Sequence, residues 1–170
     1  MKNDLYNSVS YRLVHGDLFE SIKKHTSDIL VPHVVDNSGK FNSGFASAVE
    51  KNYPIVKANY EMLATYKLGE NQFIKVETGK RNIVFVNMIA QNSNSKRSKR
   101  QINYLSLVKC MASVGTYIKN SCSEIDSRKI EIHAPKFGCG YAGGNWNFIS
   151  DLIDDIWVDF TTFVYSPKRD

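Results

Sequence analysis

The sequence predicts an α/β protein, folded as a three-layer α/β/α sandwich around a mixed central sheet. Short runs of β-branched and aromatic residues alternate along the chain with segments whose apolar residues follow helical spacing. Strands that alternate with helices pair mostly in parallel, with the helices covering the sheet. Two of the runs, residues 73–76 and 83–86, are separated only by a turn-forming segment at 78–81. These two are expected to form an antiparallel hairpin, which makes the sheet mixed.

The expected strands have strand length and polar or turn-forming flanks: residues 11–14, 29–31, 73–76, 83–86, 130–132 and 160–165. The expected helices carry apolar residues at helical spacing: residues 45–51, 56–66, 102–118 and 148–157, with a break near Pro54 between the first two. A chain of 170 residues has the usual size of one domain. Residues 1–170 are therefore expected to form a single domain.

Composition narrows the class of protein. Hydrophobic residues make up 42% and charged residues 23%, as in ordinary globular domains. The three cysteines form no disulfide framework, which favours a reducing compartment and a cytoplasmic location. We expect neither a secretion signal nor membrane association, because no apolar run approaches the ~18 residues of a membrane span. The net charge of +5 favours an anionic partner.

Two glycine-containing loops, residues 36–44 and 138–144, each follow an expected strand and open an expected helix. In an α/β sheet such loops lie at the carboxyl ends of strands, where ligands bind. Helix N-termini present N–H groups to anions, and glycine lets the backbone approach a phosphate closely. The two loops are expected to hold a diphosphate from both sides. The alternative is that they are only tight turns between strand and helix.

The second loop contains the spacing of a dinucleotide fingerprint in Gly138, Gly140 and Gly143. That fingerprint requires an acidic residue at the end of the following strand. The candidate acid, Asp159, precedes the next strand instead. This excludes a nicotinamide-dependent dehydrogenase but leaves a nucleotide diphosphate as the expected ligand.

Four segments, in order along the chain, resemble the macrodomain family. Residues 15–18 (His-Gly-Asp-Leu) resemble its adenine-binding element, and residues 33–46 resemble its first ligand loop. Residues 87–91 resemble a segment beside the distal ribose, and residues 135–146 resemble the second phosphate loop. The resemblance covers nearly the whole chain. It implies a macrodomain-like fold with ADP-ribose as the ligand. Within the family, the sequence is similar to stand-alone ADP-ribose-1″-phosphate phosphatases.

The resemblance also implies the ligand contacts. Asp17 would accept a hydrogen bond from the adenine amino group, although the alternative for this residue is a helix N-cap. The other implied ADP-ribose contacts are Leu18, Ser43, Gly44, Phe45, Gln91, Phe137, Gly138, Cys139, Gly140, Tyr141 and Ala142. Cys139 as a nucleophile is a further alternative to a small residue in a crowded phosphate loop.

The implied catalytic residues are His33, Asp36 and Asn37, in an enzyme that hydrolyses ADP-ribose-1″-phosphate or another distal-ribose adduct. His33 or Asp36 would activate water and Asn37 would orient the ribose hydroxyls. The alternative for His33 is a core histidine. No cofactor or metal is expected, because the four histidines lie on different elements.

A non-catalytic module that reads or sequesters ADP-ribose-type signals is the alternative function. Relatives that release ADP-ribose from acidic side chains use a lysine and an aspartate. Near those places this chain has Ala90 or Gln91, and Ala142 or Gly143. The partner of such a reading module would be a macromolecule that carries ADP-ribose.

The basic residues Lys96, Arg97, Lys99 and Arg100 precede the third expected helix. A solvated loop and nucleic-acid binding through phosphate contacts are both open for this run, although it lacks interleaved aromatic residues. The compact, stand-alone form is similar to phage and bacterial members of the family. That similarity implies a cytoplasmic location, in the host cytoplasm for a phage-encoded protein.

Overall fold

The computed structural model describes residues 9–42, 44–95, 100–122 and 130–167. The strands are β1 (Arg12–His15), β2 (Asp28–Asp36), β3 (Asn71–Glu77), β4 (Asn82–Gln91), β5 (Ile130–Pro135) and β6 (Thr162–Ser166). The helices are α1 (Leu18–Ile22), α2 (Phe45–Asn52), α3 (Pro54–Glu61), α4 (Tyr104–Ser121) and α5 (Trp146–Ile156). Every expected strand and helix is present, and α1 is an additional short helix.

The six strands form one sheet in the order β1-β6-β5-β2-β4-β3. All neighbouring pairs are parallel except β3 and β4, which form the expected antiparallel hairpin. The mixed sheet predicted from the sequence is therefore confirmed.

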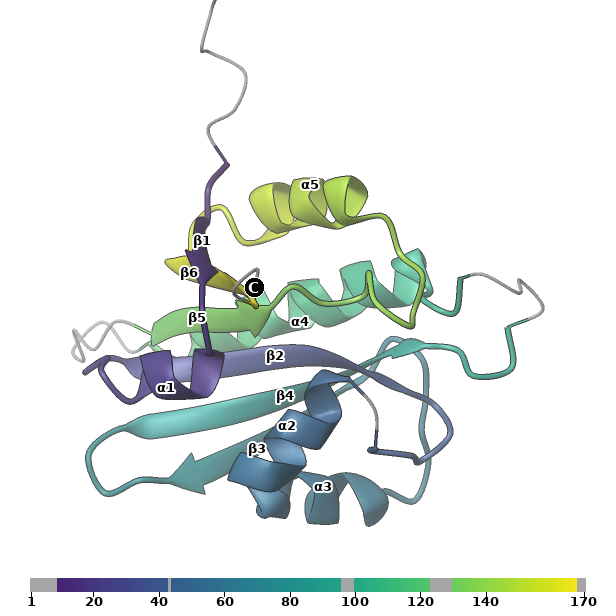
Figure 1. Ribbon diagram of the computed structural model, residues 1–170, viewed down its shortest axis with the longest axis horizontal. Helices are drawn as coiled ribbons and strands as arrows, with labels where there is room; N and C mark the ends of the chain where they lie inside the picture. Colours follow the sequence, from purple (N-terminus) through teal and green to yellow (C-terminus); the bar gives the residue numbers. More distant parts are fainter. Residues whose placement is uncertain (1–8, 43, 96–99, 123–129, 168–170) are drawn as a thin grey trace, which may run out of the picture.

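The helices cover both faces of the sheet (Figure 1). α4 and α5 pack on one face, where Leu30 belongs to their hydrophobic core. α1, α2 and α3 pack on the other face, where Ile29 and Val31 are buried. Successive side chains of β2 thus enter opposite cores, as the alternation of a strand requires. This is the three-layer sandwich that the sequence predicts.

Local sequence explains where the long helices begin. The side chain of Asn103 accepts a hydrogen bond from the N–H of Ser106 at 2.9 Å and caps α4. Asn145 does the same for α5, accepting from the N–H of Asn147 at 2.9 Å. Pro54 lies in the first turn of α3, where its missing N–H costs nothing.

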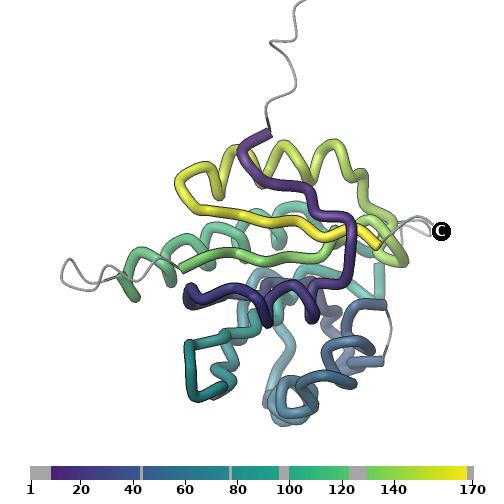
Figure 2. The backbone as a smooth tube through the Cα atoms, turned by 60° about the vertical axis from the view of Figure 1, so that its left-hand side comes forward, coloured from purple at the N-terminus to yellow at the C-terminus, as the bar shows by residue number. Residues whose placement is uncertain are grey.

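Parallel pairing brings the carboxyl ends of β2, β4 and β5 to one edge of the sheet. The loops that follow β2 and β5 therefore start close together. β1 ends at the same edge, where the N–H of Gly16 bonds the carbonyl oxygen of Ser166 on β6 at 2.9 Å. From there the chain crosses to α1, as the purple segment in Figure 2 shows. Among the described residues, no helix is long and apolar enough to cross a membrane.

Candidate functional site

Two cavities lie side by side at this edge of the sheet. The first, of about 170 Å³, is enclosed by the end of β2, the loop after it, the start of α2 and the loop after β5. The second, of about 870 Å³, is enclosed mainly by the β1–α1 connection, α1 and the start of α2. Gly44, Phe45, Pro135 and Lys136 line both cavities, so the two meet there. Their combined shape suits an elongated ligand with one end in each cavity.

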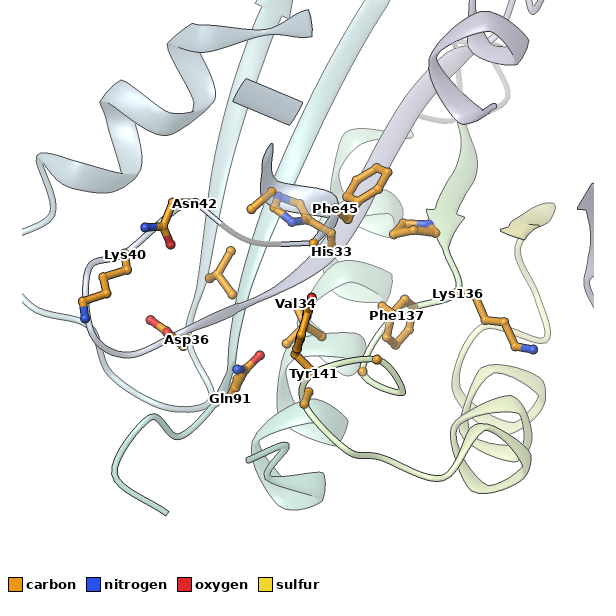
Figure 3. A pocket seen from close by; sticks show the side chains of 17 residues that line it. His33, Val34, Asp36, Lys40, Asn42, Phe45, Gln91, Lys136, Phe137 and Tyr141 are labelled. Carbon is orange, nitrogen blue, oxygen red and sulfur yellow. The ribbon is translucent and has the colours of Figure 1, made fainter. Parts of the chain in front are cut away.

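Asp36 enters the first cavity at the end of β2 (Figure 3). The register of β2 against β4 shifts after Val35, which places Asp36 opposite Gln91. One carboxylate oxygen, Oδ1, accepts hydrogen bonds from the N–H of Ser38 at 2.8 Å and from its hydroxyl at 2.6 Å. Ser38 makes no hydrogen bond to the other oxygen, Oδ2. Asp36 thus shapes its own loop with one oxygen and leaves the second outside that turn.

Tyr60 supports Asp36 from α3. Its hydroxyl donates to the backbone carbonyl oxygen of Asp36 at 2.6 Å. Burial and the nearby charge of Asp36 raise the pKa of Tyr60, so the hydroxyl remains a donor at neutral pH. The position of Asp36 therefore depends on a residue 24 positions later in the chain.

Asn37 lines neither cavity. Its side-chain oxygen accepts from the N–H of Ser93 at 3.0 Å and from the Ser93 hydroxyl at 3.1 Å. The Asn37 amide therefore ties the first loop to the segment after β4. The contact between Asn37 and a ribose stays a prediction, and in this structure the Asn37 side-chain oxygen is bonded to Ser93.

His33 lies deeper in the wall of the first cavity and is 1% exposed. Its ring packs edge-on against Phe41 and Phe45, with centroids 5.7 and 5.5 Å away. Neither ring nitrogen has a hydrogen-bond partner in the described part of the chain. Burial lowers the pKa of His33 to about 4, so the imidazole is neutral at pH 7. A base with that pKa is poorly matched to neutral pH.

The loop after β5 is closed by its own backbone. The N–H of Gly144 donates to the carbonyl oxygen of Gly138 at 2.8 Å, and the N–H of Gly143 donates to that of Gly140 at 3.0 Å. A Cβ on Gly144 would lie 2.3 Å from the Gly138 oxygen. Glycine at position 144 is therefore required by the close approach of the backbone.

Gly140, which lines the first cavity, has no such requirement. Its φ is outside the left-handed region, and a Cβ built on it would meet nothing within 4 Å. Within the described residues, the N–H groups from Gly138 to Tyr141 donate to no protein acceptor. Unpaired N–H groups beside open space are the arrangement that binds an anion.

The second cavity includes Asp17 and Leu18 from the start of α1. Asp17 caps this helix, because its Oδ1 accepts from the N–H of Glu20 at 2.9 Å. The N-cap alternative is thus correct for one oxygen of Asp17, while the residue also lines the cavity. Leu18 is buried.

Lysines surround both cavities. Lys40 and Lys136 line the first, on opposite sides of it in Figure 3, and Lys24 lines the second. The ammonium of Lys136 also lies 5.0 Å from the centre of the Trp146 ring. These charges favour an anionic ligand.

No protein-family model and no curated sequence matches the chain, but solved structures do. A protein from Bacteroides thetaiotaomicron is 24% identical, with a TM-score of 0.76 over 91% of this chain and 98% of its own. A macrodomain protein from Streptomyces coelicolor is 23% identical, with a TM-score of 0.71 over 92% and 98%. DarTG of Thermosipho africanus, solved in complex with ADP-ribose, is 19% identical, with a TM-score of 0.68 over 93% of this chain and 42% of its own.

The chain has the macrodomain fold. The fold expected from the four matched segments is therefore confirmed, from β1 to β6.

Most of the residues predicted for the site line one of the two cavities. Those that do are Asp17, Leu18, His33, Asp36, Gly44, Phe45, Gln91, Phe137, Gly138, Gly140, Tyr141 and Ala142. Cys139 does not, because its sulfur faces the carbonyl oxygen of Lys136 at 3.6 Å. Asn37 is held by Ser93, and Ser43 lies outside the described residues. Lys40 and Asn42 were missed, although a charged loop beside glycines was a signal for them.

Of the basic run, residues 96–99 lie outside the described part of the chain. The guanidinium carbon of Arg100 lies 4.5 Å from the centre of the Tyr104 ring. This contact places Arg100 against the start of α4.

A second polar cluster, outside both cavities, was also missed. Nδ1 of His25 lies 2.9 Å from Oε2 of Glu131, and Nε2 of His133 lies 3.0 Å from the same oxygen. The expectation of no metal ligands rested on the histidines being on different elements. Folding brings two of them together, since His25 precedes β2 and His133 lies on neighbouring β5. The available signal was Glu131 and His133, two residues apart on one strand face.

Proposed function

We propose that this macrodomain binds ADP-ribose or a derivative of it, with adenosine in the second cavity and the diphosphate and distal ribose in the first. Two of its structural neighbours were solved in complex with ADP-ribose, DarTG of Thermosipho africanus and the macrodomain of Trypanosoma brucei. The observation that carries the proposal is Gly140. Neither chain geometry nor packing requires glycine there, yet it lies beside unpaired N–H groups in the cavity wall.

The diphosphate would lie where the two cavities meet. α2 begins there at Gly44, whose lack of a side chain leaves the first N–H groups of the helix without a cap. Helix N-termini favour anions, and the loop from Gly138 to Tyr141 presents further N–H groups. Lys40 and Lys136 add positive charge around the first cavity. The adenine amino group would meet Asp17, whose Oδ2 is not used in capping α1.

The binding proposal is tested by calorimetric titration of ADP-ribose into Gly140→Val. Valine fills the space that the ligand would occupy, so the affinity falls by at least about tenfold while the melting temperature is unchanged. Cys139→Ala is the matched control in the same loop, because that side chain lines neither cavity. Equal affinities of the wild type and Gly140→Val would refute this placement of the ligand.

We further propose that the macrodomain hydrolyses a distal-ribose adduct, with ADP-ribose-1″-phosphate as the substrate to test. Asp36 supports this step because Oδ2 is outside the Ser38 turn and the residue lines the first cavity. Asp36 would accept a proton from the attacking water. The new bond forms between the water oxygen and phosphorus, the bond from phosphorus to the ribose oxygen breaks, and the proton held by Asp36 passes to that ribose oxygen. Neutral His33 would line the pocket without acting as the base.

The expected result is release of inorganic phosphate by the wild type and a loss of about 100-fold or more in Asp36→Asn. ADP-ribose binding by Asp36→Asn stays within about threefold of wild type. Tight binding with no phosphate released by the wild type would establish the alternative, a non-catalytic ADP-ribose-binding module. Asn37 held by Ser93 is the observation that favours this alternative.

A further inference from the structure

A cluster of metal-binding side chains lies on the α1 face of the sheet, toward the amino ends of β2 and β5. It consists of His25, Glu131 and His133, whose ligand atoms all lie within 4.8 Å of one another. None of the three lines either cavity. We propose that these residues bind one divalent transition-metal ion of the zinc class, independently of the ADP-ribose site.

Two of the three ligand pairs are already close to the spacing of a zinc site, and the two histidine nitrogens lie within 4.8 Å of each other. Oε2 of Glu131 is 2.9 Å from Nδ1 of His25 and 3.0 Å from Nε2 of His133. Ligand atoms bound to tetrahedral zinc at ~2.0–2.1 Å lie roughly 3.3 Å apart, so these contacts need to widen by only a few tenths of an ångström. Two histidines and a glutamate are an established zinc ligand set, with a fourth position for water. The side chain of His25 is 25% exposed, which leaves a path for that water.

Hydrogen bonding assigns the tautomer of His133. Tyr165 donates its hydroxyl hydrogen to Oγ of Ser21 at 3.0 Å. The Tyr165 oxygen is therefore left to accept from Nδ1–H of His133, 2.7 Å away. A neutral imidazole has only one N–H, so Nε2 presents a lone pair to the Glu131 carboxylate. Two acceptors then face each other at 3.0 Å. A cation between them satisfies both.

The surroundings keep this arrangement ready for a metal ion. The His133 side chain is fully buried. Its bond to Tyr165 is the kind of outer contact that orients metal-binding histidines. On the other side, Arg81 donates to the backbone carbonyl oxygens of His25 and Ile22 and anchors the segment that carries His25. The bound ion would clip this segment to β5.

The test is a titration of Zn²⁺ into chelator-treated full-length protein, followed by calorimetry and thermal melting. We expect one ion per chain and a melting temperature raised by about 5–10 °C at a hundred times the dissociation constant. An absence of saturable zinc binding, or an unchanged melting temperature, would overturn the proposal.

Variants locate the ion. His25→Asn keeps an N–H donor for Glu131 but removes the nitrogen lone pair, and Glu131→Gln keeps the shape while removing the charge. Each is expected to weaken zinc binding at least tenfold, because loss of even an outer contact of a metal site costs roughly 10–100-fold in affinity. His15→Asn, the same change at an exposed histidine, leaves zinc affinity unchanged. If His15→Asn weakens binding and His25→Asn does not, the ion is elsewhere and the proposal fails.

Discussion

The two loops that enclose the first cavity are held in different ways. The loop after β5 is closed by its own backbone, with Gly144 bonded to Gly138 and Gly143 bonded to Gly140. The loop after β2 is held by side chains: Ser38 binds Asp36, and Asn37 binds Ser93. Backbone closure leaves N–H groups free for a ligand, whereas side-chain closure engages the Asn37 amide and one of the two carboxylate oxygens of Asp36. The second loop thus supports the proposed binding of an anion, and the first loop carries Asp36, on which the proposed hydrolysis depends.

The largest expected effect tests the backbone closure. Gly144→Ala places a Cβ 2.3 Å from the Gly138 oxygen, so the loop must open or the chain must shift. We expect the free energy of unfolding to fall by about 3 kcal/mol or more, as overpacking of a rigid site costs. Urea denaturation measures it. A loss below about 0.5 kcal/mol would show that the second loop is not held by its backbone.

The next effect concerns His33, beneath the first loop. Its folded pKa of about 4 lies below the unfolded value near 6.5. Between these values the unfolded chain binds a proton that the folded chain does not, so stability falls as the pH drops from about 6.5 to 4. We expect His33 to contribute about 3 kcal/mol to this loss. In His33→Leu, denaturation at pH 7 and pH 4 should show a correspondingly smaller difference; an unchanged difference would contradict a buried, neutral His33.

A smaller effect tests the side-chain closure of the first loop. Tyr60→Phe removes the donor to the carbonyl oxygen of Asp36. We expect a loss of about 1–2 kcal/mol in the free energy of unfolding, because a partly buried acceptor is left unpaired. If Asp36 is catalytic, phosphate release from ADP-ribose-1″-phosphate falls more than ADP-ribose binding does. Equal losses in both would mean that Tyr60 supports binding alone.

The smallest effect separates two glycines of one loop. Gly140→Ala meets nothing within 4 Å and has ordinary φ, so stability should change by less than about 0.5 kcal/mol. Urea denaturation of Gly140→Ala and Gly144→Ala, measured side by side, gives the difference in their free energies of unfolding. A large loss in Gly140→Ala would mean that folding, rather than a ligand, requires this glycine.

Sequence predicts the strands, the mixed sheet and both glycine loops because each depends on local pattern. α1 escaped prediction because its five residues are too few to show helical periodicity. The helix expected to reach residue 66 ends at Glu61. In the site, the glycine spacing of the second loop predicted a tight loop correctly, because the hydrogen bonds that close this loop join residues close in sequence.

The rest of the site depends on contacts between distant residues. Asn37 is bonded to Ser93, 56 positions away, and its position in the motif does not show this contact. The cluster of His25 and Glu131 joins residues 106 positions apart, and only the pairing of β2 with β5 brings them together. Such contacts follow from sheet order, which local pattern does not specify.

The most direct measurement is a calorimetric comparison of ADP-ribose with AMP, titrated into the wild-type protein. AMP would fill only the second cavity, while ADP-ribose would reach through the junction at Gly44 and Lys136 into the first. We expect one ADP-ribose per chain, bound at least about tenfold more tightly than AMP. Equal affinity for the two nucleotides, or no binding of ADP-ribose, would contradict a ligand that spans both cavities.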